Sequence, residues 1–190
     1  MIQQHDLEGA TRSVQQAIEI YPKYFLACQM LGALQLETGH TEDGLNSLKR
    51  ATEINPNGYY AFHLQGSAQL MLGKLDDSLN SLQKAVALNP KSHPSHLLLG
   101  FAFVKKRLFK EAEGPLQKAY SLGGDLAIEA QRYLAVVHDQ LGRREDARAA
   151  LALYLKHAPK EADKEQIKGL ILKVSKDPGD GELLRMEDVQ

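Results

Sequence analysis

Apolar and polar residues follow a helical period along this chain, in stretches separated by short turns. In residues 25–58 the pattern predicts one helix over 25–38 and a second over about 41–54. Gly39 is suited to end the first helix. Thr41 is suited to cap the second, which we expect to end before Pro56, because a proline disfavours helical geometry in the residue before it. The segment therefore reads as a helix–turn–helix pair.

The same pattern returns every 34 residues. Four series of residues keep this step: Pro22, Pro56 and Pro90; Gly32, Gly66 and Gly100; Leu48, Leu82 and Leu116; and Ala17, Ala51, Ala85 and Ala119. Self-similarity at a period of this size indicates a solenoid of stacked units rather than one closed core. We therefore expect an all-α solenoid.

The repeats predict how the chain is divided. We expect an N-terminal half-repeat over 1–24, matching only the second helix of a unit, and full units over 25–58, 59–92, 93–127 and 128–161. A capping helix over 162–176 would cover the last apolar face with a stripe that includes Ile167 and Leu170, and a flexible tail would follow over 177–190. The half-repeat leaves one face of its helix uncovered, which predicts either a longer parent protein or pairing with another molecule.

The third unit departs from the pattern at two turns. Arg107 stands where the other units have a glycine that ends the first helix, so we expect about 1 kcal/mol of backbone strain there. The Gly123-Gly124 turn then accommodates one extra residue before the fourth unit.

These positions resemble the tetratricopeptide repeat (TPR) family. Its pattern calls for a bulky residue, a Leu-Gly pair, a small residue, an aromatic residue or Leu, an Ala and a final Pro. The first full unit supplies Cys28, Leu31, Gly32, Gly44, Leu48, Ala51 and Pro56, and the fourth unit departs from the pattern with Tyr154 at the second Ala position. The resemblance covers about residues 7–160. It implies a right-handed α-solenoid with a C-terminal capping helix, a concave face lined by the first helix of each unit, and a partner protein or peptide bound there.

The positions that line the groove in the family define the candidate partner-binding residues. They are Tyr60, His63, Leu64, Ser67, Leu97, Phe101, Val104, Arg132, Tyr133 and Val136, and the equivalent positions of the first full unit are Leu26, Gln29, Met30, Ala33 and Leu36.

Residues 96–104 are hydrophobic on every side of the predicted helix. Packing inside the array does not account for Leu97, Phe101 and Val104. Two interpretations stay open: these side chains anchor a partner helix or extended segment, or the curvature of the array or the chain's own tail covers them.

One known specialisation of the family does not fit. Co-chaperone TPR domains hold a peptide's C-terminal carboxylate with a clamp of Lys, Asn, Asn, Lys and Arg. The matching residues here are Gln29, Ala33, Leu64, Pro94 and Leu98, or, one unit later, His63, Ser67, Leu98, Glu129 and Tyr133. Neither set is a clamp, so we expect no binding of chaperone tails.

Composition excludes several other classes of function. The net charge of -1 shows no single-signed region, so we expect no nucleic-acid partner. No apolar run is long enough to cross a membrane and Met1 to Gln16 has no signal-peptide core, which leaves the compartment open with the cytoplasm as default. His93 and His96 lack companion ligands for a metal, and Cys28 occupies a packing position. We expect no catalytic residues, no cofactor and no metal.

The sequence thus predicts a non-catalytic adaptor or scaffold that binds a partner in an apolar concave groove. The alternative is a structural module that self-associates into a homo-oligomer through the uncovered N-terminal helix. An adaptor can be monomeric, whereas the alternative requires a mass that depends on concentration.

Overall fold

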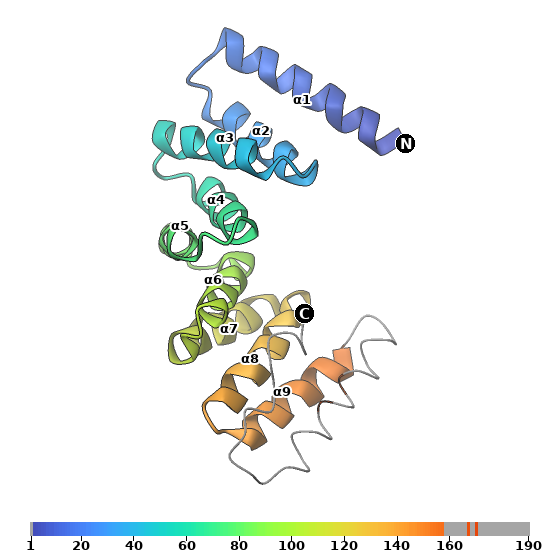
Figure 1. Cartoon of the computed structure of the whole chain (residues 1–190), viewed down its shortest axis with the longest axis vertical. Helices are drawn as coiled ribbons and strands as arrows, with labels where there is room; N and C mark the ends of the chain where they lie inside the picture. The colour runs from blue at the N-terminus through green and yellow to red at the C-terminus, as the bar shows by residue number, and fades with distance from the viewer. Residues whose placement is uncertain (1, 158–166, 168–169, 171–190) are drawn as a thin grey trace. The chain divides into compact units, whose positions relative to one another are not determined.

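A computed structural model describes residues 2–157 together with Ile167 and Leu170, and this part of the chain is helical with short turns (Figure 1). Its contacts group into two compact units, Met1–Pro90 and Lys91–Gln190. The first unit contains α1 (Ile2–Ile20), α2 (Phe25–Glu37), α3 (Thr41–Ile54), α4 (Tyr59–Met71) and α5 (Leu75–Leu88). The second contains α6 (His93–Lys105), α7 (Phe109–Gly123), the 3₁₀ helix η1 (Gly124–Ala127), α8 (Glu129–Gln140) and α9 (Arg144–His157).

The helices pack as the predicted pairs. α2 lies against α3, α4 against α5, α6 against α7 and α8 against α9, and α1 packs against α2. The all-α solenoid fold is thereby confirmed. Of the predicted capping helix, Ile167 and Leu170 are helical and buried in the core of the second unit. The rest of residues 162–176 and the predicted tail lie outside the described residues.

Small residues at the helix crossings allow each pair to pack closely. A Cβ atom added to Gly32 would lie 2.5 Å from Leu48 Cγ, far inside van der Waals contact. A Cβ added to Gly66 would likewise lie 2.5 Å from Leu82 Cγ, and one added to Gly100 would lie 2.5 Å from Leu116 Cγ. Gly32 also meets Gly44 at the crossing, since a Cβ on Gly32 would lie 3.1 Å from the Gly44 carbonyl oxygen. The repeating leucine is thus the residue that fills the space left by each glycine.

The turns inside the pairs share a left-handed residue. Its φ angle is 82° at Gly39, 70° at Gly73 and 73° at Gly142, and Arg107 adopts 59° at the equivalent place in the third unit. The sequence correctly singled out Arg107, because this region of φ places the Cβ of an ordinary residue too close to backbone atoms.

One local expectation needs correction, and one proline has an unusual place. Thr41 is the first residue of α3 rather than its cap, because His40 takes the capping position and no side chain accepts a hydrogen bond there. Pro115 lies inside α7, although a proline lacks the N–H that a helix interior requires. By contrast, Pro94 lies in the first turn of α6, where a missing N–H costs no helical hydrogen bond.

Candidate partner-binding surfaces

The first unit exposes large apolar side chains on α2 and α4. Leu26 is 45% exposed, Met30 55% and Tyr60 44%, and all three occupy positions that line the groove in TPR proteins. They border a cavity of about 480 Å³ between α1 and α2, which we call the α1–α2 groove. Its lining is Ser13, Val14, Ala17, Tyr24, Leu26, Ala27, Gln29, Met30, Ala33 and Tyr60. None of these side chains is charged, so the groove suits an apolar surface.

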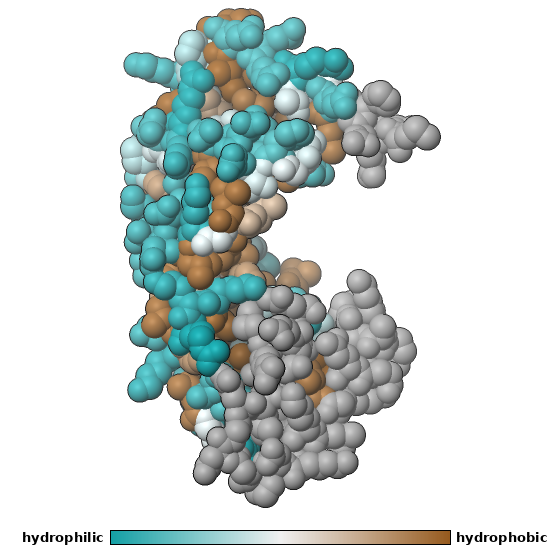
Figure 2. Space-filling model, viewed as in Figure 1, coloured by the Kyte–Doolittle hydropathy of each residue, from teal (hydrophilic) through white to brown (hydrophobic). Residues whose placement is uncertain are grey.

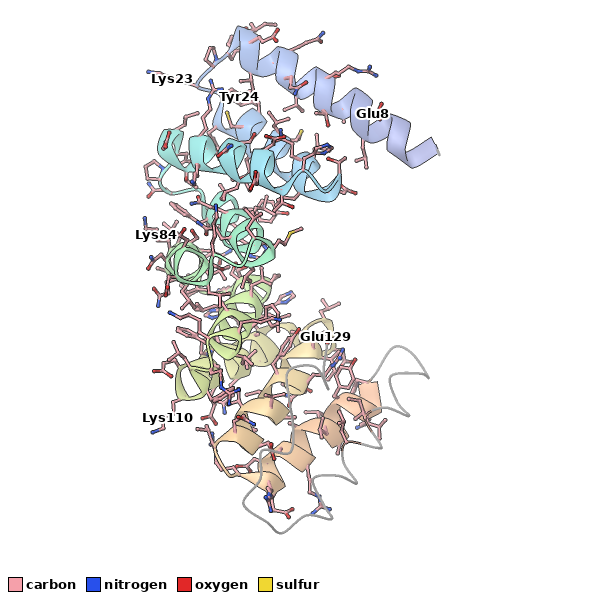
Figure 3. All side chains as sticks on the ribbon, in the orientation of Figure 1. Glu8, Lys23, Tyr24, Lys84, Lys110 and Glu129 are labelled. Atoms are coloured by element: carbon pink, nitrogen blue, oxygen red, sulfur yellow. The ribbon has the colours of Figure 1, made fainter. Side chains whose placement is uncertain are left out.

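Apolar surface continues around the connection between α1 and α2. Ile20 is 69% exposed, Tyr21 66% and Tyr24 48%, and Figure 3 places Tyr24 beside Lys23 where α2 begins. Figure 2 shows apolar surface, in brown, at this end of the first unit. Exposed apolar patches of this kind mark surfaces that contact other molecules more often than isolated apolar residues do.

Among the predicted residues of α4, Tyr60 lines the α1–α2 groove, and its ring contacts two aromatic neighbours. The rings of Tyr60 and His63 stack with centroids 5.7 Å apart and planes 12° apart, and Tyr59 meets Tyr60 edge-on at 6.2 Å. Burial lowers the pKa of His63, so the uncharged imidazole is favoured there. Leu64 and Ser67 are half-buried, and Leu64 packs against the core cluster that contains Leu48.

In the second unit, Phe101 of α6 meets Tyr133 of α8. Their ring centroids are 5.0 Å apart with planes tilted by 47°, and the Lys105 ammonium lies 5.3 Å from the Phe101 centroid. Both rings are half-buried, and Leu97 packs against the core of this unit. Burial, with a smaller contribution from the nearby Glu129 carboxylate, raises the pKa of the Tyr133 phenol.

Val104 and Val136 do not have the exposure expected of groove residues. Val104 is 0% exposed and Val136 1% exposed, and both belong to the core cluster of the second unit. A surface built from this unit therefore rests on Leu97, Phe101, Tyr133 and Arg132. The expectation that packing inside the array does not account for Val104 therefore needs correction, because its side chain lies in that core cluster.

Arg132 belongs to a polar network that the sequence analysis did not find. Its Nη1 lies 3.1 Å from Glu129 Oε2, and the Tyr154 hydroxyl donates to Glu129 Oε1 at 3.1 Å. The guanidinium also lies 5.2 Å from the Tyr154 ring centroid. Figure 3 shows Glu129 near the start of α8. The only sequence signal was Tyr154 itself, which replaces the small alanine of the family pattern with a side chain that needs a polar partner when buried.

A second network joins α7 to the turn between α8 and α9. Arg143 donates to both carboxylate oxygens of Glu113, at 2.9 and 2.7 Å, and His138 Nδ1 lies 3.8 Å from Glu113 Oε1. The hydrogen bond from Arg143 lowers the pKa of Glu113. Burial, followed by the charge of Arg143, lowers the pKa of His138. Since His138 and Arg143 lie 25 and 30 positions after Glu113 in the sequence, no local pattern could have identified the network.

The chemistry of the described residues offers few other sites. Within residues 2–157, 167 and 170, no three side chains of His, Cys, Asp or Glu come together in a way that could hold a metal ion. Cys28 is buried, and burial raises the pKa of its thiol, which disfavours the nucleophilic thiolate. No helix in this part of the chain is long and apolar enough to span a membrane.

Comparison with solved structures finds similar folds over most of the chain. MamA has a TM-score of 0.76 at 22% identity, covering 85% of this chain and 94% of that one. YrrB, described as a TPR protein with an unusual peptide-binding site, has 0.75 at 19%, covering 94% and 91%. PilW, a type IV pilus biogenesis factor, has 0.78 at 21%, covering 92% and 80%. At these identities the likeness shows a common fold.

The sequence comparisons agree with the fold. No curated protein sequence matches the chain. The profile described as tetratricopeptide repeat matches residues 30–93 and again residues 63–127, which together make up more than half of the chain. The protein therefore belongs to the tetratricopeptide repeat family, whose members are generally non-catalytic modules that bind protein or peptide partners.

Proposed function

We propose that this protein is an adaptor or scaffold that binds an apolar peptide or helix of a partner protein, with the α1–α2 groove as the main contact. The observation that carries the proposal is the exposure of Leu26, Met30 and Tyr60 around an uncharged cavity. Exposed apolar side chains are costly to leave in water, and covering them supplies the free energy of association.

Two further features support an interaction surface in the groove. Tyr24 and Tyr60 add aromatic area together with hydroxyl groups, a combination that is common at interfaces because each ring loses little conformational freedom on binding. Phe101, Leu97, Tyr133 and Arg132 form an additional candidate surface in the second unit, although their exposure is lower than that of the α2 residues.

The two methionines Met30 and Met71 offer a matched test. Met30 lines the groove and is 55% exposed, whereas Met71 is 59% exposed at the end of α4 and does not line it. Peptides would be selected from a random display library on the whole protein, and their affinity for Met30→Glu and Met71→Glu measured by fluorescence anisotropy. We expect Met30→Glu to weaken binding by about tenfold or more, because a buried unpaired carboxylate is costly.

Met71→Glu should leave the affinity within about twofold, since its side chain stays in water. Circular dichroism checks that both variants are folded. Peptides that bind both variants as well as the unsubstituted protein would contradict the α1–α2 groove as the site.

Self-association is a second candidate, favoured by one observation. Ala10, Val14 and Ala17 on α1 are half-exposed, whereas their counterparts on the other second helices are buried. Sedimentation equilibrium over a wide concentration range separates the two candidates. A monomer at all concentrations would contradict self-association and leave the adaptor function in place.

A further inference from the structure

The α1–α2 groove resembles the site that α2 occupies in this protein, shifted by one repeat unit toward the N-terminus. α2 packs against both α3 and α4. Two apolar clusters form where α2 meets these helices. One contains Ala51 of α3 and Ala61 of α4. The other contains Leu48 of α3, and Leu64 of α4 packs against it. These four positions define what a first helix contacts in this array.

The residues found 34 positions earlier line the groove. They are Val14, Ala17, Ala27 and Met30, in the order of Leu48, Ala51, Ala61 and Leu64. All four are apolar, and each occupies the same register on α1 or α2 as its counterpart on α3 or α4. The groove therefore has the shape and chemistry of the place that α2 occupies in the next unit.

The exposure of the α1 residues indicates the same site. Leu48, Leu82 and Leu116 are each 0% exposed, because a first helix covers them. Val14, the equivalent residue of α1, is half-exposed. Figure 1 shows α1 at one end of its unit, with α2 and α3 beside it.

The occupied sites also show what a helix must carry to fit. Every first helix that covers one of these leucines has a glycine at the contact, where an added Cβ would come within 2.5 Å of the leucine side chain. In α2 this glycine is Gly32, and Cys28, four residues earlier on the same face, is buried between Ala51 and Ala61. A helix with a small residue at the crossing and a medium apolar residue one turn earlier meets both requirements.

We infer that the α1–α2 groove binds a helix of a partner protein that completes the half-repeat, presenting a glycine or alanine to Val14 and an uncharged apolar residue between Ala17 and Ala27. The inference rests on the proposed function and names the class of partner. An extended peptide is disfavoured, because a helix satisfies its own backbone hydrogen bonds and an apolar groove offers few groups to replace them.

The chain's own α2 sequence supplies the probe. Residues 25–38 with Cys28→Val, which removes the thiol but keeps an apolar residue of medium size, would be fused to a soluble carrier, labelled, titrated into the whole protein and followed by fluorescence anisotropy. We expect saturable binding that weakens by about tenfold or more when the peptide also carries Gly32→Leu, because the added side chain cannot approach Val14.

Variants of the protein locate the site. Ala17→Glu should abolish binding of the probe, whereas Gln16→Glu, on the exposed side of α1, should leave it unchanged. Met30→Glu, on the opposite wall, provides a second test if Ala17→Glu proves unfolded by circular dichroism.

Three results would overturn the inference. The first two are no binding of the probe and equal binding of the Gly32→Leu peptide. The third is a concentration-dependent dimer of the protein that excludes the probe, because a second copy would then occupy the groove. If peptides from the random library still bind in a Met30-dependent manner while the probe does not, the proposed function stands and the inference about a repeat-completing helix falls.

Discussion

At the scale of single residues, Arg107 shows how a departure from the repeat is tolerated. It is the only non-glycine with a positive φ angle in the described part of the chain, at 59°. Its guanidinium lies 5.6 Å from the Phe109 ring centroid and its Nη2 donates to Gln140 Oε1 at 3.5 Å. Side-chain contacts thus accompany a backbone geometry that glycine adopts at no steric cost.

We therefore expect Arg107→Gly to be more stable than Arg107→Ala by about 1 kcal/mol, because both lose the side-chain contacts but only glycine removes the strain. Urea unfolding followed by circular dichroism measures the difference. Gly142→Ala is the reverse control: its added Cβ meets no atom within 4 Å, so any loss of stability reflects the φ angle of 73° alone. Equal stability of the two Arg107 variants would show that the turn is unstrained.

The Glu113–Arg143–His138 network predicts how pH affects the second unit. Burial lowers the pKa of His138 below its ordinary value of 6.5. The unfolded chain therefore takes up a proton near pH 6.5 before the folded chain does, and stability falls as pH drops below that value. The lowered pKa of Glu113 acts in the same direction, but only below its ordinary value of 4.5.

Replacing His138 should flatten this dependence. Between pH 7 and pH 5 we expect the melting temperature of His138→Gln to fall less steeply than that of the unsubstituted protein. In the unsubstituted protein, His138 changes the free energy of unfolding by at most about 1.4 kcal/mol per pH unit. Thermal unfolding at several pH values measures it. Parallel curves for the two proteins would mean that His138 has the same proton affinity in both states.

At the scale of helices, close crossing is what holds each pair together. Gly100 and Gly114 lie in the same pair, yet a Cβ on Gly100 would overlap Leu116 while one on Gly114 would meet no atom within 4 Å. The same substitution should therefore have opposite effects at the two positions.

We expect Gly100→Ala to cost about 1–3 kcal/mol from overpacking, and Gly114→Ala to gain about 0.5–1 kcal/mol from higher helix propensity. Equilibrium unfolding compares them. A double-mutant cycle with Leu116→Ala should recover part of the Gly100→Ala loss, because it removes the side chain that clashes. Equal effects of the two glycine substitutions would contradict the packing account.

At the scale of the whole molecule, stability is expected to be local. In a solenoid each unit contacts mainly its neighbours, so damage in one unit spreads less than in a protein with a single core. Leu48 is 0% exposed in the first unit, while α8 and α9 belong to the second.

Leu48→Ala should destabilise the first unit by about 2–5 kcal/mol through loss of contacts and a cavity. Hydrogen exchange read by mass spectrometry should show faster exchange in α2, α3 and α4, with little change in α8 and α9. A uniform increase across both units would instead indicate one cooperative fold.

The sequence by itself determined the architecture, because each repeat carries the same helix-ending and helix-packing residues at the same positions. Glycine, leucine and proline recur at fixed positions, so helix starts and ends could be predicted within a residue or two, and Arg107 could be identified as the residue that replaces a turn glycine. The groove positions of α2, including Leu26 and Met30, also followed from the register, although the residues selected as most important lay in later units.

Only the tertiary structure decided which of those positions are exposed. Val104 and Val136 share the register of groove residues but are buried, since exposure depends on what other helices cover and not on helical phase. The links from Glu129 to Tyr154 and from Glu113 to Arg143 join residues far apart in the chain. The α1–α2 groove likewise arises where two helices meet, so its uncharged lining becomes visible only once α1 and α2 are placed together.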